Sequence, residues 1–138
     1  MSRLSATAVK QLIQWCEEKA TGLGVRVSIS VVDEGGHLIG FSRMDGAAIG
    51  PGEVSQRKAR TSALFRTDSG AFGEVVRSRP LTGIESTHGG LALFKGGIPL
   101  FANGHVIGGL GIAGGTAVED LEIAEWALAQ LNDGLAAG

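Results

Sequence analysis

Apolar residues at the start of this chain recur every three or four positions, which is the spacing of a helix that buries one face. Ser5 is a typical N-cap residue, and glycine at position 22 or 24 ends the predicted helix. Cys16 lies on the apolar face, so we predict a buried thiol without reactivity. The apolar positions are Val9, Leu12, Ile13, Cys16 and Ala20.

From Val25 the spacing changes to strict alternation, because Val25, Val27, Ile29 and Val31 are separated by polar residues. This pattern predicts a strand with one face buried and the other in solvent. A turn at residues 33–36 (Asp-Glu-Gly-Gly) leads to a return strand from residue 37 to residue 44. The two strands form a predicted hairpin.

Three further strands are predicted near the end of the chain, at residues 91–94, 98–102 and 105–112. Asn103 and Gly104 separate the last two, and this dipeptide favours a two-residue type I′ turn. Pro99 has no amide hydrogen to donate inside a sheet, so the strand at residues 98–102 is predicted to lie at an edge or to begin at a bulge.

Three more helices complete the pattern. Pro51 is well placed as the first residue of a helix that extends to about Arg66. A short helix follows residues 67–69 and ends near residues 78–80. Thr116 and Glu119 form a capping box, which predicts the start of a long helix that ends between residues 129 and 135.

The order of elements predicts one α+β domain over residues 1–138, with a profilin-like antiparallel sheet of about five strands and helices packed on its faces. A chain of 138 residues can bury a core of its own. The formal net charge of −2 provides no basic surface for nucleic acid. No apolar stretch approaches the ~20 residues that span a membrane, and the start lacks a secretory segment, so we expect a cytoplasmic protein.

Residues 109–114 match the dinucleotide-binding pattern G-x-G-x-x-G after a strand and before a helix. A Rossmann unit needs a second parallel strand after that helix. The helix is predicted to end between residues 129 and 135 of 138, so the sequence leaves no room for such a strand. Glu119 and Asp120 also place negative charge where a phosphate would bind. NAD binding is therefore not predicted. The glycines indicate instead a close approach, either of a packed helix or of a ligand.

Lys58 shares one helical face with Val54, Thr61 and Phe65. Burial of its charge is costly unless a carboxylate or an anionic ligand meets the ammonium group. The other interpretation places the stem over apolar surface with the ammonium group in water. A ligand-facing role for Lys58 and this snorkelling arrangement both stay open.

The predicted loop at residues 81–90 carries Glu85 and His88, and long loops beside strands commonly hold binding residues. Two ligands are too few to define a metal site, and we predict none. An axial haem ligand would have to come from a small set of side chains. These are His37, His88, His105, Met44 and Cys16.

Five strings of residues together resemble the GlcG/HbpS family, also called the haem-degrading-domain family, over nearly the whole chain. The family includes GlcG, HbpS and OrfY proteins and the C-terminal domain of PduO-type cobalamin adenosyltransferases. The resemblance implies a small homo-oligomeric domain that binds a small molecule, with haem and a corrinoid as the tetrapyrroles to test. The strings are residues 31–38, 43–47, 58–61, 96–100 and 108–116, the last followed by Glu119 and Asp120.

Three hypotheses of function follow. The first is an accessory protein that binds a small molecule without turnover. The second is an enzyme of lyase, isomerase or hydrolase type, in which Lys58 anchors a small carboxylate-bearing metabolite, Asp45 or Glu85 acts as base and His88 as acid or base. The third is a purely structural domain that forms an oligomer. The predicted ligand-binding residues are Arg43, Asp45, Lys58, Thr61, His88, Gly96, Gly97, Gly114 and Gly115.

Overall fold

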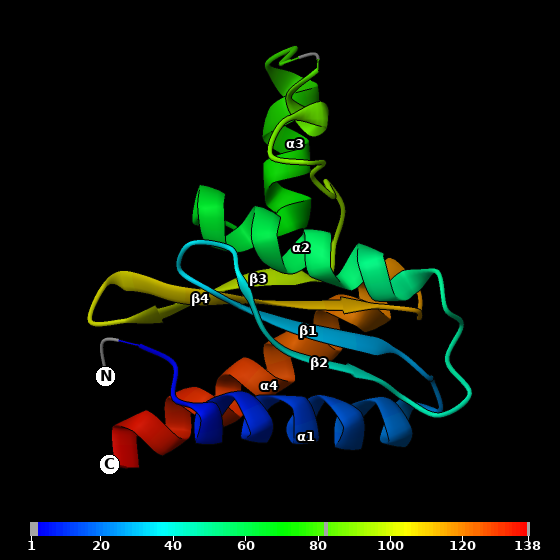
Figure 1. Ribbon diagram of the computed structural model, residues 1–138, viewed down its shortest axis with the longest axis vertical. Coiled ribbons are helices and arrows are strands. Elements are labelled where there is room, and N and C mark those ends of the chain that lie inside the picture. The colour runs from blue at the N-terminus through cyan, green and yellow to red at the C-terminus, as the bar shows by residue number, and fades with distance from the viewer. Residues whose placement is uncertain (1–2, 82, 138) are drawn as a thin grey trace.

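Four strands form one antiparallel sheet, and helices lie on both of its faces (Figure 1). The computed structural model describes residues 3–81 and 83–137, so Met1 and Ser2 of the predicted start and Thr82 of the predicted loop lie outside the described residues. The elements are α1 (Ala6–Leu23), β1 (Ser28–Asp33), β2 (Leu38–Arg43), α2 (Pro51–Phe65), α3 (Ser69–Ser78), the 3-10 turn η1 (Ile84–Ser86), β3 (Gly97–Ala102), β4 (His105–Ala113) and α4 (Ala117–Ala137).

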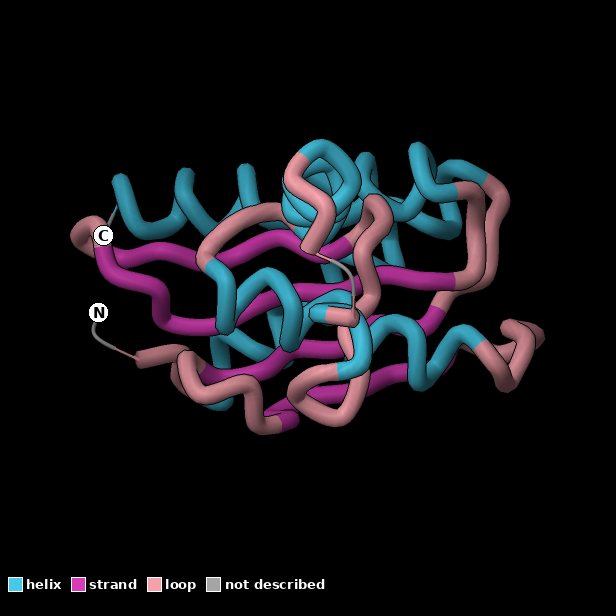
Figure 2. The backbone as a smooth tube through the Cα atoms, turned by 90° about the horizontal axis from the view of Figure 1, so that it is seen from above, coloured by secondary structure: helices cyan, strands magenta, loops and turns pink. Residues whose placement is uncertain are grey.

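The strands lie in the order β2-β1-β4-β3, so the two hairpins meet where β1 pairs with β4 (Figure 2). The predicted turn between β3 and β4 is confirmed by positive φ angles of 52° at Asn103 and 77° at Gly104. β3 is an edge strand, as Pro99 predicted. The α+β class with an antiparallel sheet is therefore confirmed.

The predicted strand at residues 91–94 does not form, so the sheet has four strands rather than five. The amide of Ala92 donates to the hydroxyl of Thr61 on α2 at 3.1 Å. The backbone of Leu93 also runs against α3, since a methyl group on Gly73 would overlap the Leu93 carbonyl oxygen. Leu91 and Ala92 are buried, and the hydrogen bonds of the segment join it to Thr61 on α2, to Ser69 on α3 and to the carbonyl oxygen of Glu85.

The two faces of the sheet are packed differently. Large aliphatic side chains such as Ile29, Leu100 and Leu110 face α1 and α4 and form the main core. The other face carries small residues under α2, where Ser30 Oγ lies 2.7 Å from Ser55 Oγ. β1 is thus buried on both faces, and the prediction of a half-exposed strand was wrong because α2 covers its polar side.

Glycines let the backbone of α2 lie directly against the sheet. A methyl group on Gly111 would overlap the Ser55 carbonyl oxygen, and one on Gly109 would overlap the Ala59 carbonyl oxygen. Gly97 on β3 meets the carbonyl oxygen of Lys58 in the same way. The close approach expected for the glycine block is made here by α2, which precedes the block in sequence.

The predicted helix ends are confirmed at three sites. Ser5 Oγ accepts a hydrogen bond from the amide of Ala8 at 3.1 Å, and Gly24 ends α1 in a left-handed conformation. At the start of α4, the amide of Glu119 donates to Thr116 Oγ1 at 3.2 Å, and the amide of Thr116 donates to Glu119 Oε1 at 2.9 Å. Among the described residues, no helix has the length and apolarity needed to cross a membrane.

Candidate functional site

Lys58 lies in the middle of α2 and is buried, with only 1% of its surface exposed. Its ammonium nitrogen Nζ donates to the carbonyl oxygen of Ile112 on β4 at 2.8 Å and to Asp120 Oδ2 at 3.1 Å. Asp120 lies in the first turn of α4, is also buried, and accepts at Oδ1 from the amide of Gly115 at 2.9 Å. A carboxylate of this chain therefore meets the buried cation.

Two glycine segments shape this arrangement. Gly96 has a φ of 128°, and a methyl group there would lie 2.6 Å from both Lys58 Nζ and the Ile112 carbonyl oxygen. Only glycine leaves room for the ammonium group at this position. Gly114 and Gly115 then turn the chain from β4 into α4, which brings Asp120 back over the end of the strand.

Burial acts in opposite directions on the two ionisable groups. It lowers the pKa of Lys58, and the charge and hydrogen bond of Asp120 oppose this change. It raises the pKa of Asp120, and the cation of Lys58 and the Gly115 amide oppose this change. Burial therefore favours the neutral form of each partner, and the close contact favours the charged pair. Nζ also lies 5.0 Å from the ring centroid of Phe94, within reach of a cation–π interaction.

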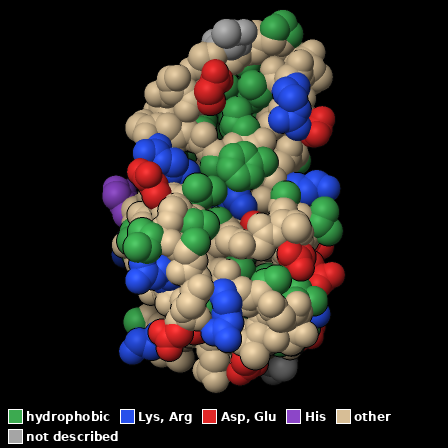
Figure 3. Space-filling model, turned by 90° about the vertical axis from the view of Figure 1, so that its right-hand side faces the viewer, with side chains coloured by type: hydrophobic (Ala, Val, Ile, Leu, Met, Phe, Trp, Pro, Cys, Tyr) green, Lys and Arg blue, Asp and Glu red, His purple; other side chains and the backbone are tan. Residues whose placement is uncertain are grey.

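A cavity of about 280 Å³ lies beside this pair, between α2 and the β4–α4 junction. Its walls include Pro51, Val54, Phe94 and Ala117, and Lys58 and Asp120 provide its charged groups. A second cavity of about 520 Å³ adjoins it between α3 and α4, and the two share Phe94 and Ala117. Figure 3 shows the end of the molecule where β4 stops, with hydrophobic side chains gathered in the middle of the face.

Some of the predicted ligand-binding residues meet at this cavity. Gly114 and Gly115 line it together with Lys58, and Gly96 lies against the ammonium group. Gly97 contacts the backbone of Lys58 from β3. Thr61 has another role, because its buried hydroxyl donates to the Arg57 carbonyl oxygen at 2.7 Å and holds the segment at Ala92.

Arg43 and Asp45 lie elsewhere: Arg43 is the last residue of β2, and Asp45 follows it near the C-terminal end of α1. The carbonyl oxygen of Asp45 accepts a hydrogen bond from Arg26 at 2.7 Å. Its side chain lines a surface depression that also contains Glu17 and Glu18. Within one chain, the structure does not bring Asp45 to the Lys58 cavity.

The loop that carries Glu85 and His88 is attached to the outer side of α2. Arg57 and Arg60 donate to the carbonyl oxygens of Gly89 and His88 respectively. The His88 ring packs edge-on against Phe65, with 5.3 Å between centroids, and its Nδ1 lies 2.8 Å from the hydroxyl of Thr87. Glu85 is exposed. Neither side chain lines the cavity beside Lys58.

The sequence analysis missed two important residues of the cavity, Asp120 and Phe94. Asp120 follows the capping residue Glu119 and was interpreted as a charge on the helix dipole and as part of the family resemblance, not as the partner of Lys58. Its contact with Lys58 spans 62 positions, which no local pattern predicts. Phe94 was assigned to a strand, although its exposed ring lies at the mouth of two cavities.

Metal-ligating side chains are dispersed in the part of the chain that the structure describes, where no three His, Cys, Asp or Glu residues come together. His37 lies at the β1–β2 turn, with Nδ1 3.1 Å from Asp33 Oδ1 and an 80% exposed side chain. The carboxylate only accepts, so Nδ1 carries the proton of this hydrogen bond. Its Nε2 is left as the ring nitrogen that can bind an electrophile or a metal.

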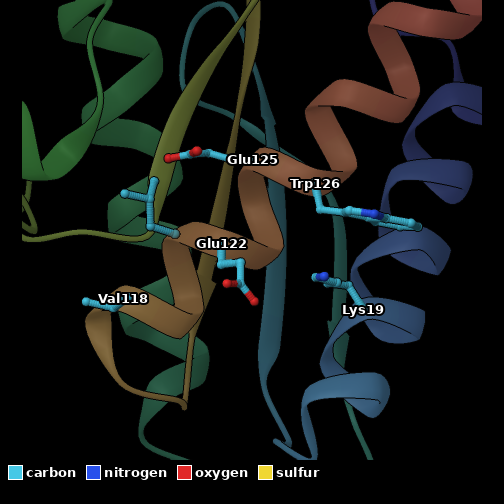
Figure 4. A pocket seen from close by; sticks show the side chains of 6 residues that line it. Lys19, Val118, Glu122, Glu125 and Trp126 are labelled. Atoms are coloured by element: carbon cyan, nitrogen blue, oxygen red, sulfur yellow. The ribbon is translucent and has the colours of Figure 1, made fainter.

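A further surface depression lies between α1 and α4 (Figure 4). Lys19 from α1 points toward Trp126 on α4, and its Nζ is 5.9 Å from the centre of the indole ring. Glu122 and Glu125 extend from the same helix as Trp126. The contact between Lys19 and Trp126 joins two helices at the surface. The depression around it shares no lining residue with the Lys58 cavity.

The fold and the site define an α+β protein with one antiparallel sheet and a buried lysine–aspartate pair at the junction of β4 and α4. A family model described as "Haem degrading protein HbpS-like" matches residues 4–129, and the chain belongs to this family. The resemblance found in the sequence is thereby confirmed.

Individual relatives agree with this assignment. An uncharacterized 15.0 kDa protein from the dhaT-dhaS intergenic region of Citrobacter freundii is 35% identical over 130 residues, covering 93% of this chain and 92% of the relative. The crystal structure of Klebsiella pneumoniae ORFY has a TM-score of 0.90 at 30% identity, with 96% and 92% of the two chains covered. A PduOC structure in complex with haem has a TM-score of 0.88 at 36% identity, covering 94% and 96%.

Proposed function

We propose that this chain is an accessory protein that binds a small organic molecule in the cavity beside Lys58 and Asp120. The observation that carries the proposal is the ammonium group of Lys58. It has three hydrogens to donate, and the structure gives it two acceptors, Ile112 and Asp120. The third hydrogen remains for an acceptor on a ligand. A buried polar group at the floor of an apolar cavity is a common way to orient a small ligand.

The charges indicate the chemical class of the ligand. Lys58 and Asp120 together are neutral, so a carboxylate on the ligand would place a second negative charge beside Asp120 in a poorly solvated site. A carbonyl or hydroxyl oxygen accepts from Lys58 without this cost. The apolar walls at Val54 and Phe94 favour an uncharged body behind that oxygen. The ligand class is therefore a small neutral molecule with one polar end.

Blocking the cavity tests this function. Ala117 is exposed, lines the cavity and makes no contact that holds the ion pair, so Ala117→Trp fills the space from its rim. Ala129→Trp, at an exposed site further along α4, is the matched control. In a thermal-shift panel of small alcohols, aldehydes and ketones, we expect stabilisation of the native chain and of the control only. Absence of any stabilising compound, or equal effects on both variants, would reject the cavity as the ligand site.

Haem is a second candidate ligand, supported by the family description and by the PduOC relative. The Lys58 cavity does not fit the iron, because its lining includes no His, Met or Cys side chain. His37 fits better. Its Nδ1 is held by Asp33, which is the second-shell arrangement typical of metal-ligating histidines, and Leu38 beside it is 48% exposed. His37 would then ligate the iron, or the cobalt of a corrinoid, at the surface.

Haem titration distinguishes the two candidates. We expect a saturable Soret shift that His37→Ala abolishes, and that His88→Ala and His105→Ala leave intact. A shift that persists in His37→Ala would place the iron elsewhere. If Ala117→Trp prevents haem binding, the tetrapyrrole binds in the Lys58 cavity instead.

The enzyme hypothesis and the structural-oligomer hypothesis each stay open with fewer candidate residues. An acid–base role next to Lys58 would fall to Asp120, since Asp45, Glu85 and His88 lie outside the cavity within one chain. A homo-oligomer is supported by the open edges of β2 and β3 and by the partly exposed rings of Phe41 and Phe101. Light scattering after size-exclusion chromatography tests the oligomer. The cytoplasmic location stays a prediction.

A further inference from the structure

We infer that Lys58 forms a reversible Schiff base with an aldehyde or ketone bound in the cavity. This inference rests on the proposed function, because it assigns a reaction to the same ligand site. It starts from three features of one place in the fold: a primary amine at the cavity floor, apolar walls, and a carboxylate 3.1 Å from the amine.

The amine must lose a proton before it can attack a carbonyl carbon. Asp120 Oδ2 already accepts a hydrogen bond from Nζ, so it is placed to receive that proton. Burial of both groups favours the neutral amine and the neutral acid, and the directions of their pKa changes agree with this. The chain has three other lysines, Lys10, Lys19 and Lys95, and none of them is buried.

The reaction balances without a further reagent. Nζ passes one proton to Asp120 and attacks the carbonyl carbon, and the carbonyl π electrons move to oxygen. Oxygen gains one proton relayed from nitrogen and a second from Asp120, and it leaves as water while the C=N bond forms. The product is a protonated imine on Lys58 opposite the Asp120 carboxylate, and no atom is oxidised or reduced. Hydrolysis reverses each step.

The cavity also limits the size and the polarity of the carbonyl compound. Its volume of about 280 Å³ is near the lower end for ligand sites, which favours a body of a few carbon atoms. Pro51, Val54 and Phe94 favour an apolar body. Beyond Phe94 and Ala117, the adjoining cavity gives space for a longer chain. Short aliphatic aldehydes and ketones are therefore the substrate class.

Reductive trapping tests the inference, with butanal as the probe and sodium cyanoborohydride as the reductant. After cleavage at glutamate, mass spectrometry locates the butyl group. We expect the peptide with Lys58 to be labelled faster than those with Lys10, Lys19 and Lys95. Lys58→Arg, which keeps the positive charge, should lose the label at this peptide. Asp120→Asn should slow labelling about a hundredfold if Asp120 transfers the proton.

Ala117→Trp and Ala129→Trp serve again as a matched pair, and circular dichroism checks that each variant is folded. Labelling of Lys58 should fail in the first and persist in the second. Butan-1-ol, which cannot form an imine, measures binding alone by thermal shift. If butan-1-ol binds in an Ala117→Trp-sensitive way while Lys58 is labelled no faster than the other lysines, the Schiff base is rejected and the binding function stands. If neither compound binds, the proposed function fails first.

Discussion

Lys58 Nζ and Asp120 Oδ2 lie 3.1 Å apart although 62 positions separate the two residues in the chain. Their contact joins the middle of α2 to the first turn of α4 across the end of β4. Both side chains are almost fully buried, so removing one partner leaves an unpaired charge in an apolar environment.

Breaking the pair should therefore destabilise the protein strongly. We expect Lys58→Met to lower the free energy of unfolding by about 3–5 kcal/mol, because it leaves the Asp120 carboxylate buried without a partner. The double variant Lys58→Met with Asp120→Leu should cost much less than the two single changes together, since no charge remains. Urea denaturation of the four proteins measures this coupling. Additive losses would show that the two charges do not depend on each other.

The glycines under α2 should not tolerate a side chain. In Gly111→Ala the methyl group would overlap the Ser55 carbonyl oxygen and lie 2.7 Å from the Ala59 amide nitrogen. We expect a loss of about 3 kcal/mol in the free energy of unfolding, at the upper end for overpacking. Gly22→Ala in α1 is the control, because no atom lies within 4 Å of the added methyl group. This change should stabilise the protein by about 0.5–1 kcal/mol in the same thermal or urea assay.

The β1–β2 turn should respond to acid. Slight burial raises the pKa of Asp33, but hydrogen bonds from the amides of His37 and Gly35 and from the His37 ring outweigh this and lower it. A carboxyl group with a lowered pKa in the folded protein stabilises it above the unfolded value of 3.8, and this contribution is lost as the pH falls through the folded pKa. Asp33→Asn should thus destabilise the protein at pH 6 and have little effect near pH 2. An equal loss at both values would contradict this explanation.

Cys16 should be inert in the folded protein. It is fully buried among the residues of α1 that face the sheet, and burial raises the pKa of its thiol strongly. We expect no reaction with Ellman's reagent in buffer and one thiol per chain in guanidinium chloride. Rapid reaction in buffer would mean that α1 opens from the sheet far more often than the structure indicates.

Features set by neighbouring residues could be predicted from the sequence. The turn at Asn103 and Gly104, the cap at Ser5 and the capping box of Thr116 each depend on contacts within four positions. The alternation at Ser28 and Ser30 was misleading, because α2 buries both of these small side chains, and Ser55 on that helix provides a hydrogen-bond partner for Ser30. Residue type alone does not show which face a helix from another part of the chain will cover.

The candidate site was predicted in part for the same reason. Lys58 was recognised because a cation on an apolar stripe needs a partner, and the structure provides one. Asp120 could not be identified as that partner, since its sequence position has an equally good local explanation at a helix start. Its role depends on how closely α2 lies to β4, which the glycines permit but do not reveal.

That close packing also fixes where α2 lies along the sheet. The atoms that meet Gly97, Gly109 and Gly111 are main-chain carbonyl oxygens of the helix, at Lys58, Ala59 and Ser55. Every residue type carries the same carbonyl, so exchanging the outward-facing residues of α2 leaves these contacts unchanged. The amine of Lys58 is thus held in register by the polypeptide backbone, and the helix surface is free to diverge in sequence without moving it.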